Sequence, residues 1–432
     1  MTISYAPAAS YSDKLNITLA SGELPKVMTL LGGDVKSAAF INAMRSGAFW
    51  EVGPYLKNYP NLANMPAIGY ENTMYDGKTY GLYRYRDAAR EGLIFRKDWL
   101  DNLGLKTPTT IDELYTALKA FAHNDPDQNG KQDTYGLIDA NNIFGFNTIF
   151  AIFGSPQGYE VKDGKFIPAH ETAENFEAMK FLRKLYEEKI LVSDFAVMTP
   201  AQRNEMIYTG KGGAVFATVD GAQRYQQETE KINPKARFDI TQQIKGPKGE
   251  RIPSYPGHNG IVVFPKSSVK TEAELKQILS FYNKLGDDKM IDLFAWGIEG
   301  VSYKVENNTF VGIDNFQTPS GWKVFEQLTV YDTLGLTKQQ KKFATPLEEK
   351  INRLIKKEGA SIITKDPSAP LNSETKGIKG PEIDKIIYDA RVKFIMGMMD
   401  EAGYKQELEK WRKLGGSQIL LELETEYAKA TK

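Results

Sequence analysis

Apolar residues follow two spacings along this chain, one typical of strands and one typical of helices. Short runs of consecutive apolar residues predict buried strands, and the clearest are 26–31, 92–95, 213–218 and 261–264. Apolar residues three and four positions apart predict amphipathic helices, and the clearest are 109–124, 173–189, 272–285 and 287–296. A shorter β-like segment covers 2–5, and Asp76-Gly77 marks a hairpin turn between two β-prone runs.

Strands and helices alternate, which favours an α/β fold with mostly parallel sheets flanked by helices. The last third is mostly helical, with helices expected over 338–357 and 381–429. Segments rich in Gly, Pro and Lys at 103–110 and 242–256 are candidate crossings between two lobes that would leave a central cleft. We therefore expect lobe 1 to comprise 1–108 and 251–325. Lobe 2 would comprise 109–250 and most of 326–432.

Composition narrows the function. The 432 residues and 48.5 kDa suit two or more domains. Lys and Arg total 55, as do Asp and Glu, which argues against a broad electrostatic grip on nucleic acid or on an anionic membrane. There is no cysteine, so disulfides, thiolate metal sites and cysteine nucleophiles are excluded. No apolar run approaches the roughly 20 residues that span a bilayer, and no secretion leader is visible.

The sharpest local motif is an oxygen-rich loop over 125–133. Oxygen ligands fall at loop positions 1, 3, 5 and 9, a glycine falls at the sharp turn, and position 7 supplies a backbone carbonyl. The side-chain ligands are Asp125, Asp127, Asn129 and Asp133, and the carbonyl ligand is that of Lys131. This spacing predicts a structural Ca²⁺ site. The departure is Gly136, where a bidentate glutamate is usual, and the alternative is a solvated Asp/Asn turn.

Aromatic residues beside polar groups form a second pattern. The chain has 22 Tyr, 22 Phe and 5 Trp, and several lie in expected loops at 80–90, 153–159 and 294–303. Flat rings stack on the C–H faces of sugars while neighbouring polar groups bind hydroxyls, so a carbohydrate-binding cleft is one interpretation. The other interpretation is that most of these rings belong to the core.

A carboxylate pair in such a cleft would instead suit a calcium-dependent polysaccharide-degrading enzyme. The acidic residues near aromatics are Asp87, Glu91, Glu299 and Asp314. The sequence gives no distance between them. The motifs GxSxG, HExxH and the phosphate-binding P-loop are all absent.

Four segments together resemble one family. They are KLNITLASGELPKV (14–27), the long block 76–121 that begins DGKTYGLYRYRDAAREGLIF, the oxygen-rich loop with its trailing TYGL, and WGIEGVSY (296–303). They resemble the extracellular solute-binding lipoproteins of ABC-type importers, in the oligosaccharide-binding family 1 branch common in Firmicutes, related to maltose- and alginate-binding proteins. The resemblance runs through nearly the whole chain in consistent order.

The resemblance implies a two-lobed, periplasmic-binding-protein-like fold of type II that closes by hinges on an oligosaccharide and delivers it to membrane permease subunits without catalysis. It also implies a calcium loop and a lipid anchor at the outer face of the cell membrane. The family normally has a first strand and helix before the segment that begins at Thr2. These elements, the leader and the lipidation cysteine are missing from this sequence. We expect a monomer.

Eight residues are the expected ligand contacts. Tyr85 and Trp296 would stack on sugar rings, whereas Arg86, Asp220 and Glu299 would bind hydroxyls or uronate carboxylates. The complete set is Tyr85, Arg86, Phe146, Asp220, His258, Trp296, Glu299 and Tyr303.

Overall fold

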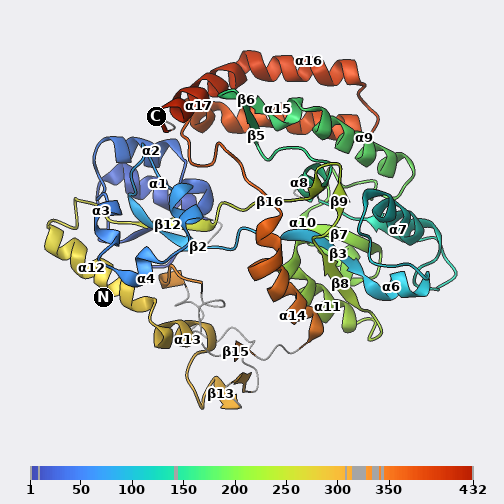
Figure 1. Cartoon of the computed structure of the whole chain (residues 1–432), viewed down its shortest axis with the longest axis horizontal. Helices are drawn as coiled ribbons and strands as arrows, with labels where there is room; N and C mark the ends of the chain where they lie inside the picture. The colour runs from blue at the N-terminus through green and yellow to red at the C-terminus, as the bar shows by residue number, and fades with distance from the viewer. Residues whose placement is uncertain are drawn as a thin grey trace. The chain divides into compact units, whose positions relative to one another are not determined.

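The structure is a computed structural model that describes residues 2–7, 10–140, 145–306, 309–313, 327–332, 340–341 and 345–430. The chain forms two compact units, each assembled from three separate segments (Figure 1). Unit 1 comprises Met1–Asp87, Pro256–Phe343 and Ala369–Gly377. Unit 2 comprises Ala88–Tyr255, Ala344–Ser368 and Ile378–Lys432.

Unit 1 is built around a three-stranded sheet in the order β1-β12-β2. Strand β12 pairs antiparallel with both neighbours, so β1 and β2 run in the same direction. The strands are β1 (Met28–Leu30), β2 (Gly81–Tyr85) and β12 (His258–Val263). The helices are α1 (Tyr11–Ser21), α2 (Ala38–Arg45), α3 (Gly53–Leu56), α4 (Pro60–Ala63), α5 (Ala67–Glu71), α12 (Glu272–Leu285) and α13 (Asp288–Trp296). A small outlying sheet contains β13 (Tyr303–Glu306), β14 (Thr309–Gly312) and β15 (Gln340–Lys341).

Unit 2 contains a four-stranded sheet in the order β4-β7-β3-β8. Its strands are β3 (Glu91–Arg96), β4 (Tyr135–Leu137), β7 (Gly212–Thr218) and β8 (Phe238–Thr241). The helices are α6 (Lys97–Asn102), α7 (Ile111–His123), α8 (Phe146–Ile152), α9 (Ala173–Glu187), α10 (Pro200–Tyr208), α11 (Ala222–Glu230), α14 (Pro346–Arg353), α16 (Glu401–Trp411) and α17 (Ser417–Ala430), and α15 (Glu374–Ile395) begins in the last unit 1 segment. Short pairs are β5 (Tyr159–Lys162) with β6 (Lys165–Pro168), β9 (Lys245–Gly246) with β10 (Gly249–Glu250), and β11 (Ile252–Pro253) with β16 (Ile363–Thr364).

The unit 2 sheet lies between two helical layers because side chains alternate across a strand. In β3, Leu93 and Phe95 pack into one core cluster with α7, α8, α9 and α15. Ile94 packs into the opposite cluster with α10, α11 and α14. Strand β7 follows the same alternation, with Phe216 in the first cluster and Val215 in the second. The predicted helix over 173–189 is confirmed as α9, with Thr172 as its N-cap.

The expectation of mostly parallel sheets is wrong. Among the described strand pairs, only β4–β7, β11–β16 and β14–β15 are parallel. In unit 2, β3 is inserted antiparallel between β7 and β8, which therefore run in the same direction. In unit 1, β12 is inserted in the same way. The two inserted strands, β3 and β12, each come directly after the point where the chain enters the unit. The two strands on either side of each inserted strand run in the same direction as each other.

Two further expectations differ from the structure. The first change of unit falls at Asp87–Ala88 rather than after residue 108, because β3 and α6 belong to unit 2. Residues 2–7 form neither helix nor strand, since no described strand pairs with them. In the C-terminal third, the helical region expected over 381–429 is confirmed and consists of α15, α16 and α17.

Candidate functional site

Strand pairing brings three predicted ligand residues together in unit 1. His258 is the first residue of β12 and lies opposite Tyr85, the last residue of β2. The adjacent Arg86 donates from Nη1 to Oδ1 of Asn259 at 3.1 Å. The Tyr85 hydroxyl donates to Oδ1 of Asp87 at 2.8 Å. These residues, which we call the unit 1 cluster, combine an aromatic ring with amide, guanidinium, imidazole and carboxylate groups.

A bulge in β12 orients this cluster. The register with β2 shifts between His258 and Ile261. Gly260 has a φ of 108°, and a Cβ there would lie 2.0 Å from the Leu30 carbonyl oxygen, so only glycine fits. The Gly260 N–H donates to Nδ1 of His258 at 3.2 Å, which leaves the ring proton on Nε2.

His258 is a buried strand residue, 7% exposed. Burial, reinforced by the charge of Lys36, lowers the pKa of His258 to about 4. The imidazole is therefore neutral at physiological pH, and its Nε2–H is a hydrogen-bond donor.

A second group of polar residues lies in unit 2, where β3 begins. Asp220 follows β7 in the short helical turn Val219–Gly221. Its Oδ2 forms an ion pair with Nη2 of Arg90 at 2.5 Å. The Arg90 guanidinium also lies over the ring of Tyr255, 5.7 Å from its centroid. The Tyr255 hydroxyl donates to Oε1 of Glu91 at 2.7 Å. We call Arg90, Glu91, Asp220 and Tyr255 the unit 2 cluster.

Two carboxyl groups in unit 2 are almost completely buried. Glu91 is 1% exposed and Asp139 is 2% exposed. Burial raises the pKa of each to about 7, although the positive charge of Arg203 acts in the opposite direction on both. Oε2 of Glu91 is buried and has no hydrogen-bond partner among the described residues. Glu91 is thus a strongly perturbed group at the edge of the unit 2 cluster.

The other expected ligand residues lie elsewhere. Phe146, in α8, is fully buried and packs against Phe195 in the unit 2 core, so its ring presents no face to a ligand. Trp296 and Tyr303 are 8% exposed and form a small cluster at the end of α13. Glu299 is exposed in the turn that pairs with Tyr303. Of the four acidic candidates for an enzyme, Asp314 lies outside the described residues.

Sequence reasoning missed several residues of these groups. Asn259 follows a histidine that was singled out, but nothing in PGHNG distinguishes its side chain. Asp139 follows β4 in a parallel pair, and such strand ends often carry functional residues. Lys36 had no signal at all, being a single lysine before the N-cap of α2.

The oxygen-rich loop forms a tight turn stabilised by its own side chains. The Asp125 carboxylate accepts the N–H groups of Asn129 and Gly130, each at 3.0 Å. The Asn129 amide donates to Asp127 at 2.8 Å and to Asp133 at 3.3 Å. Lys211 forms an ion pair with Asp133 at 2.5 Å.

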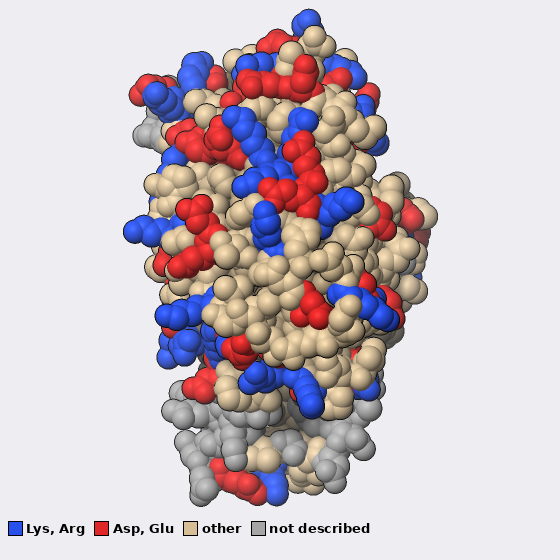
Figure 2. All heavy atoms as spheres, turned by 90° about the vertical axis from the view of Figure 1, so that its right-hand side faces the viewer, with Lys and Arg blue, Asp and Glu red and all other residues tan. Residues whose placement is uncertain are grey.

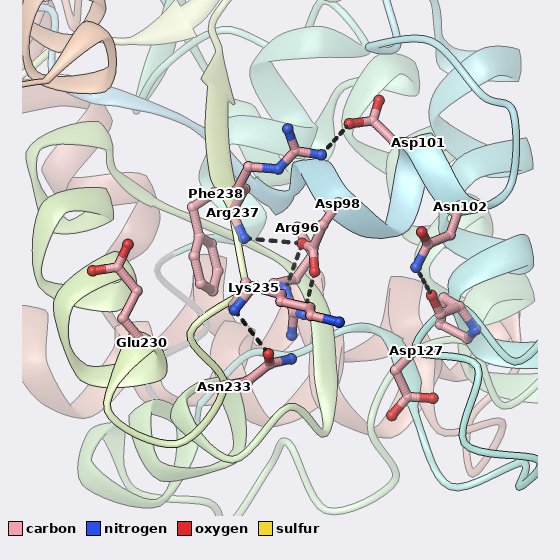
Figure 3. Close-up of polar contacts among 12 residues, drawn as sticks. Arg96, Asp98, Asp101, Asn102, Asp127, Glu230, Asn233, Lys235, Arg237 and Phe238 are labelled. Atoms are coloured by element: carbon pink, nitrogen blue, oxygen red, sulfur yellow. Dashed lines mark hydrogen bonds and ion pairs between the residues drawn. The ribbon is translucent and has the colours of Figure 1, made fainter.

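The loop is fastened to α6, where Asn102 donates to the Pro126 carbonyl at 2.9 Å (Figure 3). Oδ1 of Asp127 is buried without a hydrogen-bond partner among the described residues. Within the described part of the chain, no three His, Cys, Asp or Glu side chains are grouped closely enough to hold a metal ion.

Next to the loop, a buried ion pair supports β3 and α6. Arg96 is 2% exposed and binds Asp98 through two hydrogen bonds, at 2.8 and 2.6 Å (Figure 3). Its guanidinium lies 4.6 Å from the centroid of the Trp99 ring. Both charges are satisfied locally, so we assign this group a structural role.

Unit 1 also contains an apolar groove of about 620 Å³. It is lined by the N-terminal segment, α1, β1 and α12, including Ile3, Tyr11, Met28, Ile278 and Phe281. Its mostly apolar lining does not suit a polyhydroxylated ligand, which needs several hydrogen-bonding groups.

Acidic and basic side chains are interspersed over the face drawn in Figure 2, without an extended area of one sign. Electrostatic attraction at that face is therefore short-range. Over the described ranges, no helix combines the length and the apolar character needed to cross a bilayer.

Comparisons with known proteins agree with the fold. The family model for bacterial extracellular solute-binding proteins matches residues 2–287. The polygalacturonan/rhamnogalacturonan-binding protein YtcQ of Bacillus subtilis is 39% identical over 100% of this chain and 86% of its own length. Lipoprotein LipO of the same organism is 36% identical over 98% and 86%. Alginate-binding protein AlgQ2, in a crystal structure without calcium, has a TM-score of 0.68 at 18% identity, covering 96% of this chain and 89% of AlgQ2.

Proposed function

The chain belongs to the family of bacterial extracellular solute-binding proteins, and on that premise we propose that it captures an oligosaccharide and delivers it to the permease of an ABC-type importer. The observation that carries this proposal is the 39% identity with a protein named for binding polygalacturonan and rhamnogalacturonan, which extends over the whole chain. The unit 1 cluster adds chemistry suited to a sugar, with a tyrosine ring beside several hydrogen-bonding groups.

The proposal is tested by thermal shift and calorimetry of the full chain against neutral and acidic oligosaccharides. A ligand at a hundred times its Kd adds about 2.7 kcal/mol to the free energy of unfolding, which raises Tm by several degrees. We expect such a shift with at least one sugar. If no sugar of either class shifts Tm or gives binding heat, the proposal is wrong.

The same samples test the enzyme alternative, which the family does not favour because its members bind solutes. Incubation with polygalacturonate and mixed glycans should release no reducing ends. Sustained release that disappears on replacement of Glu91 or Glu299 would favour an enzyme instead.

We further propose that the protein acts at the outer face of the cell membrane as a lipid-anchored monomer. The name of one relative, lipoprotein LipO, supports the anchor. Metabolic labelling of the native protein with a fatty acid tests the anchor. The molar mass measured by analytical ultracentrifugation tests the monomer.

We also propose that the loop over 125–133 binds Ca²⁺ as a structural ion. The donor set fits a hard cation, because Asp125, Asp127, Asn129 and Asp133 offer oxygen atoms at alternate spacing. The supporting observation is that Oδ1 of Asp127 is buried without a hydrogen-bond partner among the described residues, as expected of an oxygen that binds an ion. Oxygens of these four side chains and the Lys131 carbonyl would hold the ion, which would neutralise three nearby carboxylates.

A further inference from the structure

Lys36 is a cation whose hydrogen-bond partners are both neutral. Its Nζ lies 2.9 Å from Oδ1 of Asn372 and 3.5 Å from the carbonyl oxygen of Met74. No carboxylate among the described residues lies within ion-pair distance of it. By contrast, the exposed Lys26 has Glu274 at 2.9 Å. A poorly hydrated ammonium without an anion is costly, and proteins usually compensate it with a carboxylate or a ligand.

The surroundings of Lys36 make its positive charge less stable than in water, which favours a bound anion. Burial and the positive charge of Lys376 lower the pKa of Lys36 to about 8, although the negative charge of Asp76 opposes them. The group still carries its proton at neutral pH. Lys36 is partly exposed, so an anion from solvent can reach it.

Lys36 also lies near the donors of the unit 1 cluster. The turn that precedes it contacts Asn259, whose side-chain oxygen is 3.9 Å from the position of a Cβ on Gly32. That same oxygen accepts from Arg86. His258 is close enough for the charge of Lys36 to lower its pKa, and its Nε2–H is a further donor. The turn that precedes Lys36 therefore packs against the start of β12, where Arg86 and His258 also lie.

We propose that Lys36, with Arg86 and His258, forms a subsite in unit 1 that binds the carboxylate of an acidic sugar. An anionic oxygen would replace the missing partner of Lys36, and a guanidinium and a neutral imidazole would complete the recognition of a planar carboxylate. This inference rests on the proposed capture of an oligosaccharide and narrows it to chains that contain uronic acid.

The test is calorimetry of the full chain and of Lys36→Met with trigalacturonate and with its fully methyl-esterified form. Methionine retains the length of the side chain and removes the charge. We expect Lys36→Met to weaken trigalacturonate binding at least tenfold, and to change the affinity for the ester or a neutral oligosaccharide by less than threefold. Its Tm without sugar should equal or exceed that of the unsubstituted chain, because an uncompensated charge is removed.

The matched control is Lys57→Met, which removes an exposed positive charge from the same unit and should leave every affinity unchanged. Equal weakening by both substitutions would reduce the effect to net charge and overturn the subsite. Unchanged trigalacturonate affinity in Lys36→Met would overturn it as well. If the unsubstituted chain binds neutral sugars but not trigalacturonate, the subsite is wrong while the capture function stands. If it binds no sugar, both fall.

Discussion

Glu91 illustrates how one buried residue makes stability depend on pH. Burial raises its pKa to about 7, since Tyr255 and the nearby arginines only partly offset the loss of hydration. The folded state therefore holds a proton that the unfolded state releases near the ordinary glutamate pKa of roughly 4.3. Between these two values the unfolded state binds fewer protons, so the contribution of Glu91 to the free energy of unfolding falls as pH rises.

Replacement of Glu91 by Gln, which stays neutral, should stabilise the protein at pH 8 by about 1–3 kcal/mol and change little at pH 5. Chemical denaturation at both pH values measures this difference. Glu160→Gln, at an exposed position of β5 in the same unit, should have no such pH-dependent effect. A loss of stability in Glu91→Gln at pH 8 would mean that the charged form of Glu91 is stabilising.

At the residue scale, strand pairing brings some of the expected ligand residues together, whereas burial in the core removes another from any ligand. Tyr85, Arg86 and His258 were selected for their side-chain types, and the β2–β12 pairing brings them together. Phe146 was selected on the same grounds but is buried in the core of unit 2. Aromatic rings serve cores and ligands equally well, so composition alone cannot separate these roles.

Among the elements, the loop over 125–133 is the clearest case of a local pattern that specifies local structure. Its spacing predicted the sharp turn, and Gly130 has a φ of 77°. The structure also explains why the usual glutamate is absent after the loop. A Cβ on Gly136 would lie 2.1 Å from the Leu118 carbonyl oxygen, so no side chain fits there. If the loop binds Ca²⁺, its affinity should be lower than that of a loop with a bidentate ligand.

Calcium should raise the Tm of the protein by several degrees relative to EDTA, because only the folded loop offers the ligands together. Asp127→Ala should abolish most of that difference, whereas Asp163→Asn, in the β5–β6 turn, should preserve it. Asp163 has a φ of 52°, which asparagine also adopts readily. Identical melting with and without calcium would leave the loop as a solvated turn.

Across the whole molecule, sequence patterns located most helices and strands but not the strand order. The hydrophobic periods of α7, α9 and α12 are local, and the structure confirms those helices. The insertion of β3 and β12 between other strands depends on contacts distant in sequence, which periodicity does not encode. The division into units was displaced at Asp87–Ala88 for the same reason.

A chain that ends at residue 255 should lack a cooperative thermal transition, because β1 and β2 would have no strand between them and unit 2 would lose α14 to α17. Calorimetry and near-ultraviolet circular dichroism of this fragment test the expectation. Adding residues 256–432 as a separate chain should restore part of the near-ultraviolet signal. Cooperative melting of the fragment alone would show that the strand β12 is dispensable.

The late position of β12 in the sequence also determines when the unit 1 sheet can form during translation. The central strand of the first sheet leaves the ribosome long after its two neighbours, and the Ala369–Gly377 segment of the same unit follows later still. Closing such long loops makes folding slow, as expected for a high contact order. Unit 1 therefore cannot complete its sheet until β12 (His258–Val263) has been made, which is after more than half of the 432 residues.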